Sequence, residues 1–292
     1  NINLNFMKIY ILGISGMLGS KLFHEFLKKK YKVRGSLRTI PKKFLRYKSN
    51  IDSNIDVNNI LKLKKKILKF KPDIVINCIG VIKQKIDQSE EKNIFYINSV
   101  FPHELYKISN MINSKLIHFS TDCVFDGKKG NYNEESIPNA YDVYGISKSL
   151  GELNLKNSLT IRTSIIGHEL NSNNSLLEWF LQLKKDKCYG YVHAYFSGMP
   201  TIEVFNFLEK FILKNKKVSG IYNLSSTKIS KYNLLKKISN KYSKKIKIIK
   251  SKKLKIDRSL NSNKLKELVK YKCPSWDDLI KNMYINQFKD LK

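Results

Sequence analysis

The chain has 292 residues, of which 42% are hydrophobic, and this content excludes a disordered tail and predicts one large or two modest folded domains. Its formal net charge of +31 would ordinarily suggest a nucleic acid or an anionic membrane as partner. Only five of the basic residues are arginines, however, and lysine is the poorer bidentate reader of bases and phosphates. We therefore interpret the charge as a solvated lysine surface and expect no nucleic-acid and no membrane partner.

The four cysteines also exclude classes of protein. Cys78, Cys123, Cys188 and Cys273 are far apart and lack the spacing of a disulfide framework or a zinc site. They indicate reduced thiols in a cytoplasmic protein with no bound metal. The sequence has no run of eighteen or more apolar residues, so we expect no membrane span.

Short apolar runs alternate with amphipathic stretches through the first half of the chain. Because strands separated by helices form parallel sheets, this order predicts an α/β fold with a Rossmann-type doubly wound sheet and ligands at the carboxyl ends of the strands. Strands are expected at 8–13, 31–37, 54–57, 73–79, 115–120 and 159–166, and helices near 17–30, 58–70, 89–112 and 141–156.

The order loosens from about residue 167. A helix near 174–185, an aromatic run at 188–196, a helix near 201–215 and a strand from 220 precede further short lysine-rich elements. This pattern predicts a smaller α/β domain for the substrate, interleaved with the first. We expect a sheet domain at 7–166, joined by 201–224, and a mainly substrate-binding domain at 167–292.

A glycine-rich turn follows the first predicted strand. In "ILGISGMLGS", Gly13 permits the tight turn, Gly16 lets the backbone approach a pyrophosphate and Gly19 allows close helix packing. Three glycines alone are weak evidence, but their place after the first strand of an alternating pattern indicates dinucleotide binding. The same turn would contribute Ser15, Met17 and Leu18.

The end of the second predicted strand bears on which dinucleotide is bound. An NAD-preferring site usually has Asp or Glu there, whereas "YKVRGSLRT" offers Ser36, Arg34 and Arg38. Because a guanidinium suits a 2′-phosphate, we expect NADP(H), with NAD(H) as the alternative; both arginines could instead be simply exposed. Later strand ends add seven further cofactor contacts: Asp56, Val57, Asn77, Cys78, Ile79, Gly80 and Ser120. The expected set is completed by Asn98, Tyr144 and Lys148.

"YGISK" places Tyr144 and Lys148 one helical turn apart. A tyrosine can protonate an alkoxide if a nearby ammonium lowers its pKa toward the working pH. With 16 tyrosines and 50 lysines in 292 residues, about three such pairs arise by chance, from 16 × 50/292. The second pair, Tyr232 and Lys236, does not follow a strand-end hydroxyl, and we interpret Tyr232 as a packing residue.

The stretch "KLIHFSTDCVFDG" supplies that strand-end hydroxyl. Ser120, Thr121 and Asp122 come directly after the fifth predicted strand, where Thr121 could hydrogen-bond a substrate carbonyl beside the tyrosine. Asp122 could orient the substrate or Thr121, or only cap the following turn. We interpret His118 as packed beneath the site, and Cys123 as no nucleophile because no histidine is linked to it.

Seven motifs together resemble the extended short-chain dehydrogenase/reductase superfamily: the glycine turn, "NCIG", "INSVFPHEL", "STDCVFDG", "YGISK", "IRTSIIG" and "GMPT". The resemblance is closest to the dTDP-4-dehydrorhamnose reductase branch and runs from Lys8 to "IDRSLNSNKL". It implies an NADPH-dependent oxidoreductase that reduces the 4-keto group of a nucleotide-diphospho-6-deoxy sugar for deoxysugar and polysaccharide biosynthesis. The family's catalytic residues map to Thr121, Tyr144 and Lys148, and its helix asparagine to Asn98.

The resemblance also implies a set of substrate contacts. Arg258 stands where family members use a C-terminal arginine near the substrate phosphates, whereas Arg162 could equally be structural. The expected substrate-binding residues are Val124, Phe125, Arg162, Ser164, Pro200, Thr201 and Arg258.

Cys123 departs from the family pattern and leaves the subgroup open. Related nucleotide-sugar dehydratases have a glutamate there that moves protons during elimination, and the reductase branch usually has an aromatic residue. An epimerase or dehydratase on the same scaffold is therefore an alternative. So is a non-catalytic NADP-binding regulatory subunit, since the branch includes a methionine adenosyltransferase partner protein. A homo-oligomer is also left open.

Overall fold

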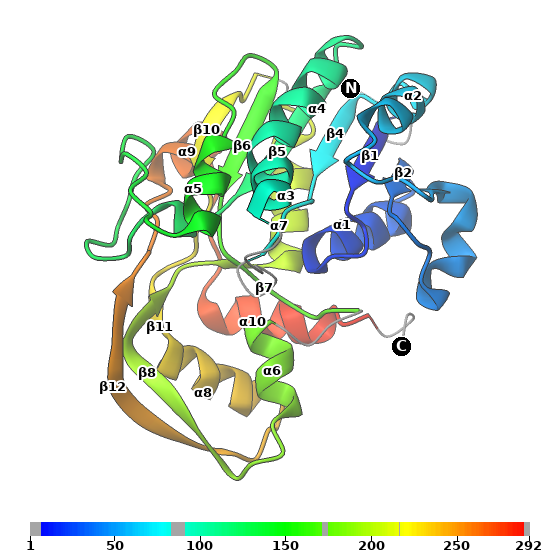
Figure 1. Cartoon of the computed structure of the whole chain (residues 1–292). Coiled ribbons are helices and arrows are strands. Elements are labelled where there is room, and N and C mark those ends of the chain that lie inside the picture. The colour runs from blue at the N-terminus through cyan, green and yellow to red at the C-terminus, as the bar shows by residue number, and fades with distance from the viewer. Residues whose placement is uncertain (1–6, 83–90, 171–174, 216, 289–292) are drawn as a thin grey trace.

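Seven parallel strands form the central sheet of the computed structural model, which describes residues 7–82, 91–170, 175–215 and 217–288. Their order is β10-β6-β5-β4-β1-β2-β3, and helices cover both faces (Figure 1). This arrangement confirms the Rossmann-type doubly wound α/β fold. The strands are β1 (Lys8–Leu12), β2 (Lys32–Ser36), β3 (Ile51–Asp52), β4 (Ile74–Asn77), β5 (Lys115–Ser120), β6 (Ser158–Arg162) and β10 (Gly220–Asn223).

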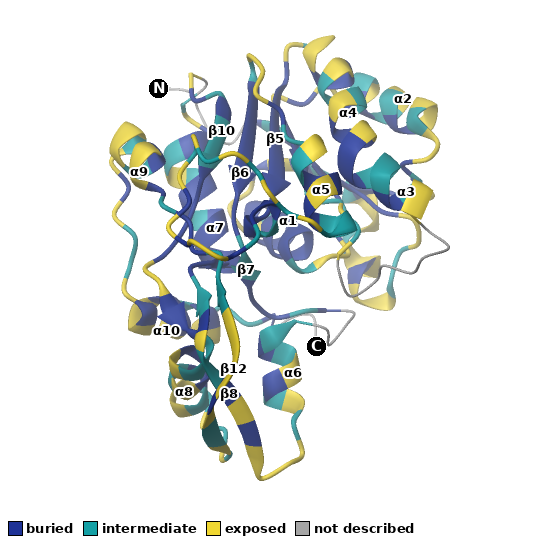
Figure 2. Cartoon of the chain, turned by 60° about the vertical axis from the view of Figure 1, so that its left-hand side comes forward, coloured by how far each residue is buried: buried dark blue, intermediate teal, exposed yellow. Residues whose placement is uncertain are grey.

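Apolar side chains on both faces of each strand hold the helices to the sheet, as expected for a buried parallel sheet. Alternate residues of β1 divide between two clusters: Ile9 and Ile11 join one, Tyr10 and Leu12 the other. Figure 2 shows the central strands buried. The helices of this domain are α1 (Met17–Lys28), α2 (Ile60–Phe70), α3 (Glu91–Phe95), a π-helix (Tyr96–Val100), α4 (Phe101–Asn110), α5 (Val143–Leu150) and α7 (Thr201–Phe207).

The smaller domain is built around a three-stranded sheet. The long strands β8 (Lys187–Phe196) and β12 (Lys247–Asp257) pair in parallel, and β11 (Ile229–Ser230) pairs antiparallel with β8. Three helices pack against it around one apolar cluster: α6 (Leu176–Gln182), α8 (Lys231–Lys241) and α10 (Trp276–Ile285).

The chain returns to the central sheet between β8 and β11 (Figure 1). The short strands β7 (Ile165–Ile166) and β9 (Met199–Pro200) pair where it crosses between the domains. From there α7 leads through a second π-helix (Leu208–Ile212) to β10, which pairs with β6. The short helix α9 (Asn263–Val269), which lies between β12 and α10 in the chain, contacts β10.

Two expectations about local structure need correction. The strand expected at 54–57 lies instead at Ile51–Asp52, because Asn54 has a left-handed φ of 56° that ends extended structure. A 3₁₀-helix at Lys42–Asn50 precedes it and was not expected. The helix expected at 89–112 is divided by the π-helix, and its first residues lie outside the described part of the chain.

Candidate active site

The turn after β1 can be made only with glycine at two of its positions. Gly13 has a φ of 77°, a left-handed conformation that favours glycine. Gly19 packs so closely on this turn that a Cβ there would overlap the backbone carbonyl of Gly13. Gly16 precedes the first residue of α1. The start of α1 is thus held against the end of β1, as a dinucleotide pyrophosphate requires.

A cavity of about 380 Å³ opens beside this turn, at the carboxyl ends of β1, β2 and β4. It brings together ten of the expected cofactor residues: Gly13, Ser15, Gly16, Ser36, Arg38, Asp56, Val57, Cys78, Ile79 and Gly80. Its wall also contains six residues that the sequence analysis missed: Leu37, Ile55, Asn58, Val81, Asn93 and Ile97. The first four adjoin residues that we had named, but only tertiary folding brings Asn93 and Ile97 from the next helices to the cavity.

Arg34 does not line this cavity, in contrast to our expectation. Its guanidinium donates two hydrogen bonds to Asp52 at the end of β3, from Nε at 3.0 Å and from Nη2 at 3.1 Å. The Tyr10 hydroxyl and the Lys66 ammonium also contact this carboxylate. Because Asp52 is buried, removing Arg34 would leave its charge with Lys66 as the remaining ion-pair partner among the described residues, so Arg34 serves the contact between β2 and β3. Arg38 remains at the cavity wall.

The start of α5, which carries Tyr144, packs on the loop after Thr121, because a Cβ on Gly145 would overlap the Cys123 carbonyl. The Thr121 hydroxyl donates to Asp122 Oδ1 at 3.2 Å and accepts from the backbone N–H of Cys123 at 3.1 Å. Burial raises the pKa of Tyr144, while a hydrogen bond with Thr121 lowers it. Tyr144 is in the first turn of α5, where the Asp142 side chain caps the N–H of Gly145. Tyr144 therefore holds its proton at neutral pH, as a proton donor must.

Lys148 follows one turn later on the buried side of α5. Its ammonium donates a 2.7 Å hydrogen bond to the backbone carbonyl of Phe119 in β5. Burial lowers the pKa of Lys148 to about 8, and the carboxylate of Glu152 acts in the opposite direction. A lysine in this state can change its charge near neutral pH.

Asn98 joins the π-helix to both α5 and the loop after β4. Its amide donates to the Ser147 hydroxyl and to the Val81 carbonyl, each at 3.1 Å, and its oxygen accepts from the Val81 N–H at 2.9 Å. A Cβ on Gly80 would lie 3.4 Å from the Asn98 oxygen and 3.8 Å from the Lys148 ammonium. Asn98 is thus next to Lys148 at the edge of the cavity.

Glu152 is buried two residues after the end of α5, and the sequence analysis missed it. Its Oε1 accepts from the Ser120 hydroxyl at 2.7 Å and from Arg162 Nε at 2.8 Å, and its Oε2 accepts from Arg162 Nη2 at 2.6 Å. We had expected Ser120 to contact the cofactor and Arg162 to contact the substrate. Both instead bind Glu152, and a single glutamate after "YGISKSL" gave no signal of it.

Two of the residues expected at the sugar pocket are completely buried. Val124 and Phe125 have no exposed surface, and the Phe125 ring stacks on Tyr132 with centroids 4.2 Å apart. The guanidinium carbon of Arg162 lies 5.2 Å from the centre of the Phe125 ring. These residues therefore support the loop after β5 from beneath.

The other expected substrate residues lie near the crossing between the domains. The backbone carbonyl of Ser164 accepts from the N–H of Met199 at 2.8 Å, Pro200 precedes α7, and Thr201 is buried against Gly167. Arg258, at the end of β12, donates from Nε to the Phe125 carbonyl at 2.8 Å and from Nη1 to Cys123 Sγ at 3.6 Å. Of the two arginines expected to bind the substrate, Arg258 is thus hydrogen-bonded to the loop that follows Thr121, whereas Arg162 is paired with Glu152.

Burial raises the pKa of the Cys123 thiol to about 12, with Asp122 adding to the effect. The thiol therefore stays protonated, which agrees with our interpretation that it is no nucleophile. His118 is fully buried, and its Nδ1 accepts from the Asn77 amide at 3.1 Å. Burial lowers the pKa of His118, so the ring is neutral beneath the site.

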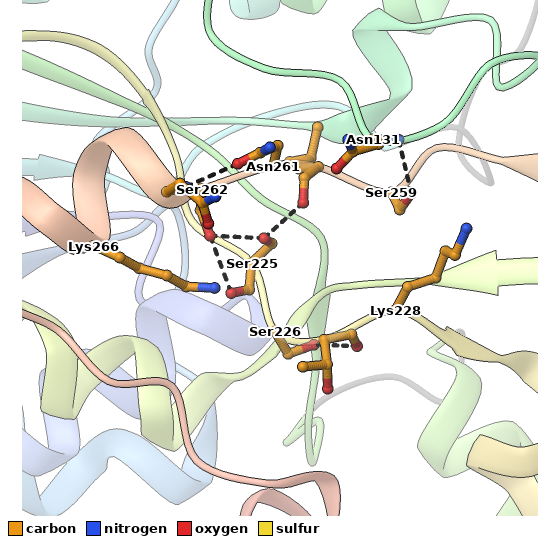
Figure 3. Close-up of a pocket in the computed structure, with 11 residues that line it drawn as sticks. Asn131, Ser225, Ser226, Lys228, Ser259, Asn261, Ser262 and Lys266 are labelled. Carbon is orange, nitrogen blue, oxygen red and sulfur yellow. Dashed lines mark hydrogen bonds between the residues drawn. The ribbon is translucent and has the colours of Figure 1, made fainter.

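A second pocket is lined in part by residues 259–263, which follow Arg258 in the chain (Figure 3). It has a volume of about 290 Å³ and is lined by serines, asparagines and two lysines. Ser225 Oγ is 2.8 Å from Ser262 Oγ and donates to the Leu260 carbonyl, which fixes the segment after Arg258. Two lysines among eleven lining residues is what 50 lysines in 292 residues give by chance, so the pocket's composition indicates no particular ligand.

Two further observations concern metals and membranes. No group of three or more His, Cys, Asp or Glu side chains in the described part of the chain is arranged to hold a metal ion. Within the same residues, no helix combines the length and apolar character needed to cross a bilayer.

A family model described as the RmlD substrate binding domain matches residues 7–288. The chain belongs to this family. The match confirms the resemblance drawn from the motifs, and it covers the elements that carry Thr121, Tyr144 and Lys148 as well as the segment of Arg258.

Two curated relatives differ in what their names describe. A dTDP-4-dehydrorhamnose reductase of Aggregatibacter actinomycetemcomitans is 30% identical over 184 residues, which are 59% of this chain and 62% of the relative. Methionine adenosyltransferase 2 subunit beta of Xenopus tropicalis is 30% identical over 142 residues, or 49% of this chain. The chain matches only about 40% of the length of that subunit.

A solved structure extends the comparison to the whole fold. The crystal structure of dTDP-4-dehydrorhamnose reductase from Bacillus anthracis in complex with NADP has a TM-score of 0.80 and 22% sequence identity. The superposition covers 96% of this chain and 99% of that chain. At this identity the likeness shows that the RmlD-family fold is shared.

Proposed function

We propose that this protein is an NADPH-dependent reductase of the 4-keto group of a nucleotide-diphospho-4-keto-6-deoxy sugar. The observation that carries the proposal is that α5 packs with Tyr144 beside the loop of Thr121, while Lys148, one turn further along, bonds to Phe119 at the end of β5. A carbonyl oxygen beside Thr121 and Tyr144 would have one hydroxyl to orient it and a second to protonate it.

The residues around the cavity fit NADP(H). Gly13 and Gly19 let the start of α1 pack closely on the turn after β1, which places the helix N-terminus where it can face a pyrophosphate. Ser36 and Arg38 supply a hydroxyl and a guanidinium at the end of β2, a donor set suited to a 2′-phosphate. When bound, the reduced nicotinamide would supply the hydride for the carbonyl carbon. NAD(H) remains the alternative, since Arg34 is paired with Asp52.

The chain's own groups then account for the proton. Tyr144 would donate its phenolic proton to the carbonyl oxygen as negative charge develops there, and Thr121 would hold that oxygen in place. The Lys148 ammonium, one turn away, would favour the tyrosinate left behind. Asn98 would keep the loop after β4 and α5 at a fixed separation through Val81 and Ser147.

The substrate's diphosphate would be bound by Arg258. Two of its nitrogens contact Phe125 and Cys123, which aims the guanidinium at the loop that carries Thr121. A planar guanidinium is suited to paired hydrogen bonds with phosphate oxygens. The name of the Aggregatibacter relative, a dTDP-4-dehydrorhamnose reductase, supports a sugar of this class.

The proposal is tested by following NADPH and NADH oxidation with a panel of dTDP-, UDP- and GDP-linked 4-keto-6-deoxy sugars. We expect at least one sugar to be reduced, with faster turnover of NADPH. Reduction of none would overturn the proposal.

The Xenopus relative favours one alternative, a non-catalytic regulatory subunit that binds NADP. Its name describes a methionine adenosyltransferase subunit, and the match covers 49% of this chain. Binding of NADPH without reduction of any sugar, together with co-elution with a methionine adenosyltransferase catalytic subunit, would support this alternative. A dehydratase or epimerase would instead convert a nucleotide sugar without net consumption of NADPH.

A further inference from the structure

Three consecutive residues of the chain tie the candidate catalytic groups to one carboxylate. The Phe119 carbonyl accepts from the Lys148 ammonium, the Ser120 hydroxyl donates to Glu152, and Thr121 follows directly. Arg162, at the end of β6, holds the same carboxylate with two hydrogen bonds of 2.6 and 2.8 Å. The ends of β5, β6 and α5 thus meet at Glu152.

This junction is buried. The side chains of Glu152 and Arg162 are 4% and 3% exposed, so both charges are shielded from water. Ion pairs of this kind are costly to break singly, because the remaining partner becomes an isolated buried charge. The Ser120 contact means that a shift of Glu152 would move the residue next to Thr121.

Glu152 also bears on the charge of Lys148. Lys148 has no ion-pair partner within 4 Å in the described residues, and Glu152 stands four residues after it. The other ionisable groups that face its ammonium are the Cys78 thiol after β4 and the His118 ring on β5. Burial keeps both of these neutral by raising the pKa of Cys78 and lowering that of His118. Glu152 is therefore the facing group that carries a negative charge.

We propose that Glu152 is a positioning residue, which sets the spacing between Thr121 and the helix of Tyr144 and Lys148 and keeps the Lys148 ammonium charged. The inference rests on the proposed function for the catalytic use of Lys148, but the state of that ammonium is measurable without a substrate. A role that is only structural would leave the titration of Lys148 unchanged.

The test is competitive acetylation of the folded protein with acetic anhydride across pH 6 to 11, followed by mass spectrometry of the peptide that contains Lys148. Glu152→Gln removes the charge and leaves Arg162 buried without a partner. The double variant Glu152→Gln/Arg162→Gln removes both charges. It replaces the single variant in the Lys148 titration if the single variant does not fold. Ser120→Ala removes one hydrogen bond and keeps the carboxylate. Glu203→Gln is the matched control, because Glu203 is also buried and accepts a 2.8 Å bond from Tyr271 but does not face Lys148.

We expect the pH of half-titration of Lys148 to fall by about one unit in the Glu152 variants, since an opposite charge nearby favours the ammonium. Ser120→Ala and Glu203→Gln should leave it within about 0.3 units of wild type. Where a sugar is reduced, the basic limb of the kcat/KM profile should move to lower pH in the same variants. An unchanged Lys148 titration in the double variant, or an equal shift in Glu203→Gln, would overturn the proposal whether or not any sugar is reduced.

Discussion

The Lys148 ammonium is bonded to the backbone carbonyl of Phe119, 29 residues earlier, at 2.7 Å. This bond fixes the last turn of α5 to the penultimate residue of β5. Because Thr121 comes two residues after Phe119, and Tyr144 one turn before Lys148, the bond also sets how near the two hydroxyls lie. Four predictions test the site and the fold that positions it.

Replacing Tyr144 with Phe should lower kcat for the reduced sugar by about 10²- to 10⁴-fold, the usual contribution of a general acid. The dissociation constant for NADPH should change little, because the ring is kept. Steady-state kinetics and fluorescence titration with NADPH measure the two effects. Tyr232→Phe is the control, since Tyr232 also has a lysine four residues later but packs between Lys236 and Lys250 in the small domain. Equal activity of the two variants would contradict the assignment of Tyr144.

Replacing Arg38 with Gln should weaken NADPH binding by about 10- to 100-fold and leave NADH binding nearly unchanged. The reason is the loss of a charge-assisted bond to a 2′-phosphate, worth about 1.5–3 kcal/mol. Arg34→Gln is the contrasting variant: it removes one partner of buried Asp52, so it should reduce thermal stability and affect both cofactors alike. Calorimetric titration with each cofactor measures the selectivity. Equal losses for NADPH and NADH in Arg38→Gln would argue against NADP(H) selection by this residue.

Replacing Gly19 with Ala should destabilise the protein by about 1–3 kcal/mol and weaken dinucleotide binding, because the added Cβ overlaps the Gly13 carbonyl. Gly16→Ala provides a control in the same turn. Its Cβ would lie 3.5 Å from the Gly13 carbonyl oxygen, an ordinary contact, and its φ of −78° suits any residue. Urea unfolding of both variants makes the comparison, and NADPH titration is made on Gly19→Ala alone, because Gly16 lies where the pyrophosphate is expected. A Gly19→Ala protein as stable as Gly16→Ala would contradict the close packing of α1 on the turn.

Lys115 is a buried lysine at the start of β5 whose ammonium donates to the Asn215 carbonyl. Burial lowers its pKa from 10.5 to about 8. Below about pH 8 it is protonated in both the folded and the unfolded protein, so the full cost of burying the charge is present. As pH rises from about 8 to 10.5, only the folded protein has released the proton, and the wild type becomes more stable.

Lys115→Met should therefore stabilise the protein at pH 7 by up to about 3 kcal/mol, less what is lost with the Asn215 bond. The advantage over wild type should shrink between pH 8 and 10. Urea unfolding at pH 7 and pH 9.5 measures both effects, and Lys107→Met, at an exposed position of α4, serves as control. A stability difference that does not depend on pH would show that the Lys115 charge is not the cause.

Local signals in the sequence were sufficient for the fold and for part of the site. Apolar runs separated by helical patterns predicted strands β1, β2, β4, β5 and β6, because the strands of a parallel sheet covered on both faces are rich in apolar residues. The place of β3 was missed, since a two-residue strand has no pattern of its own and the left-handed turn at Asn54 follows it. The π-helix that positions Asn98 likewise has no sequence signature that the pattern of apolar residues could reveal.

Short-range geometry also explains which residues of the candidate site could be predicted from the sequence. Gly13, Gly16 and Gly19 lie within seven residues after β1, Tyr144 and Lys148 share one helical face, and Thr121 directly follows β5, so each follows from spacing along the chain. The partners of the buried charged side chains do not follow from spacing along the chain. Arg34 meets Asp52 because β2 is beside β3, and Arg162 meets Glu152 because α5 ends over β5 and β6. A charge in a parallel sheet pairs with whichever chain segment lies next to it, and that neighbour is set by strand order, which only the tertiary structure decides.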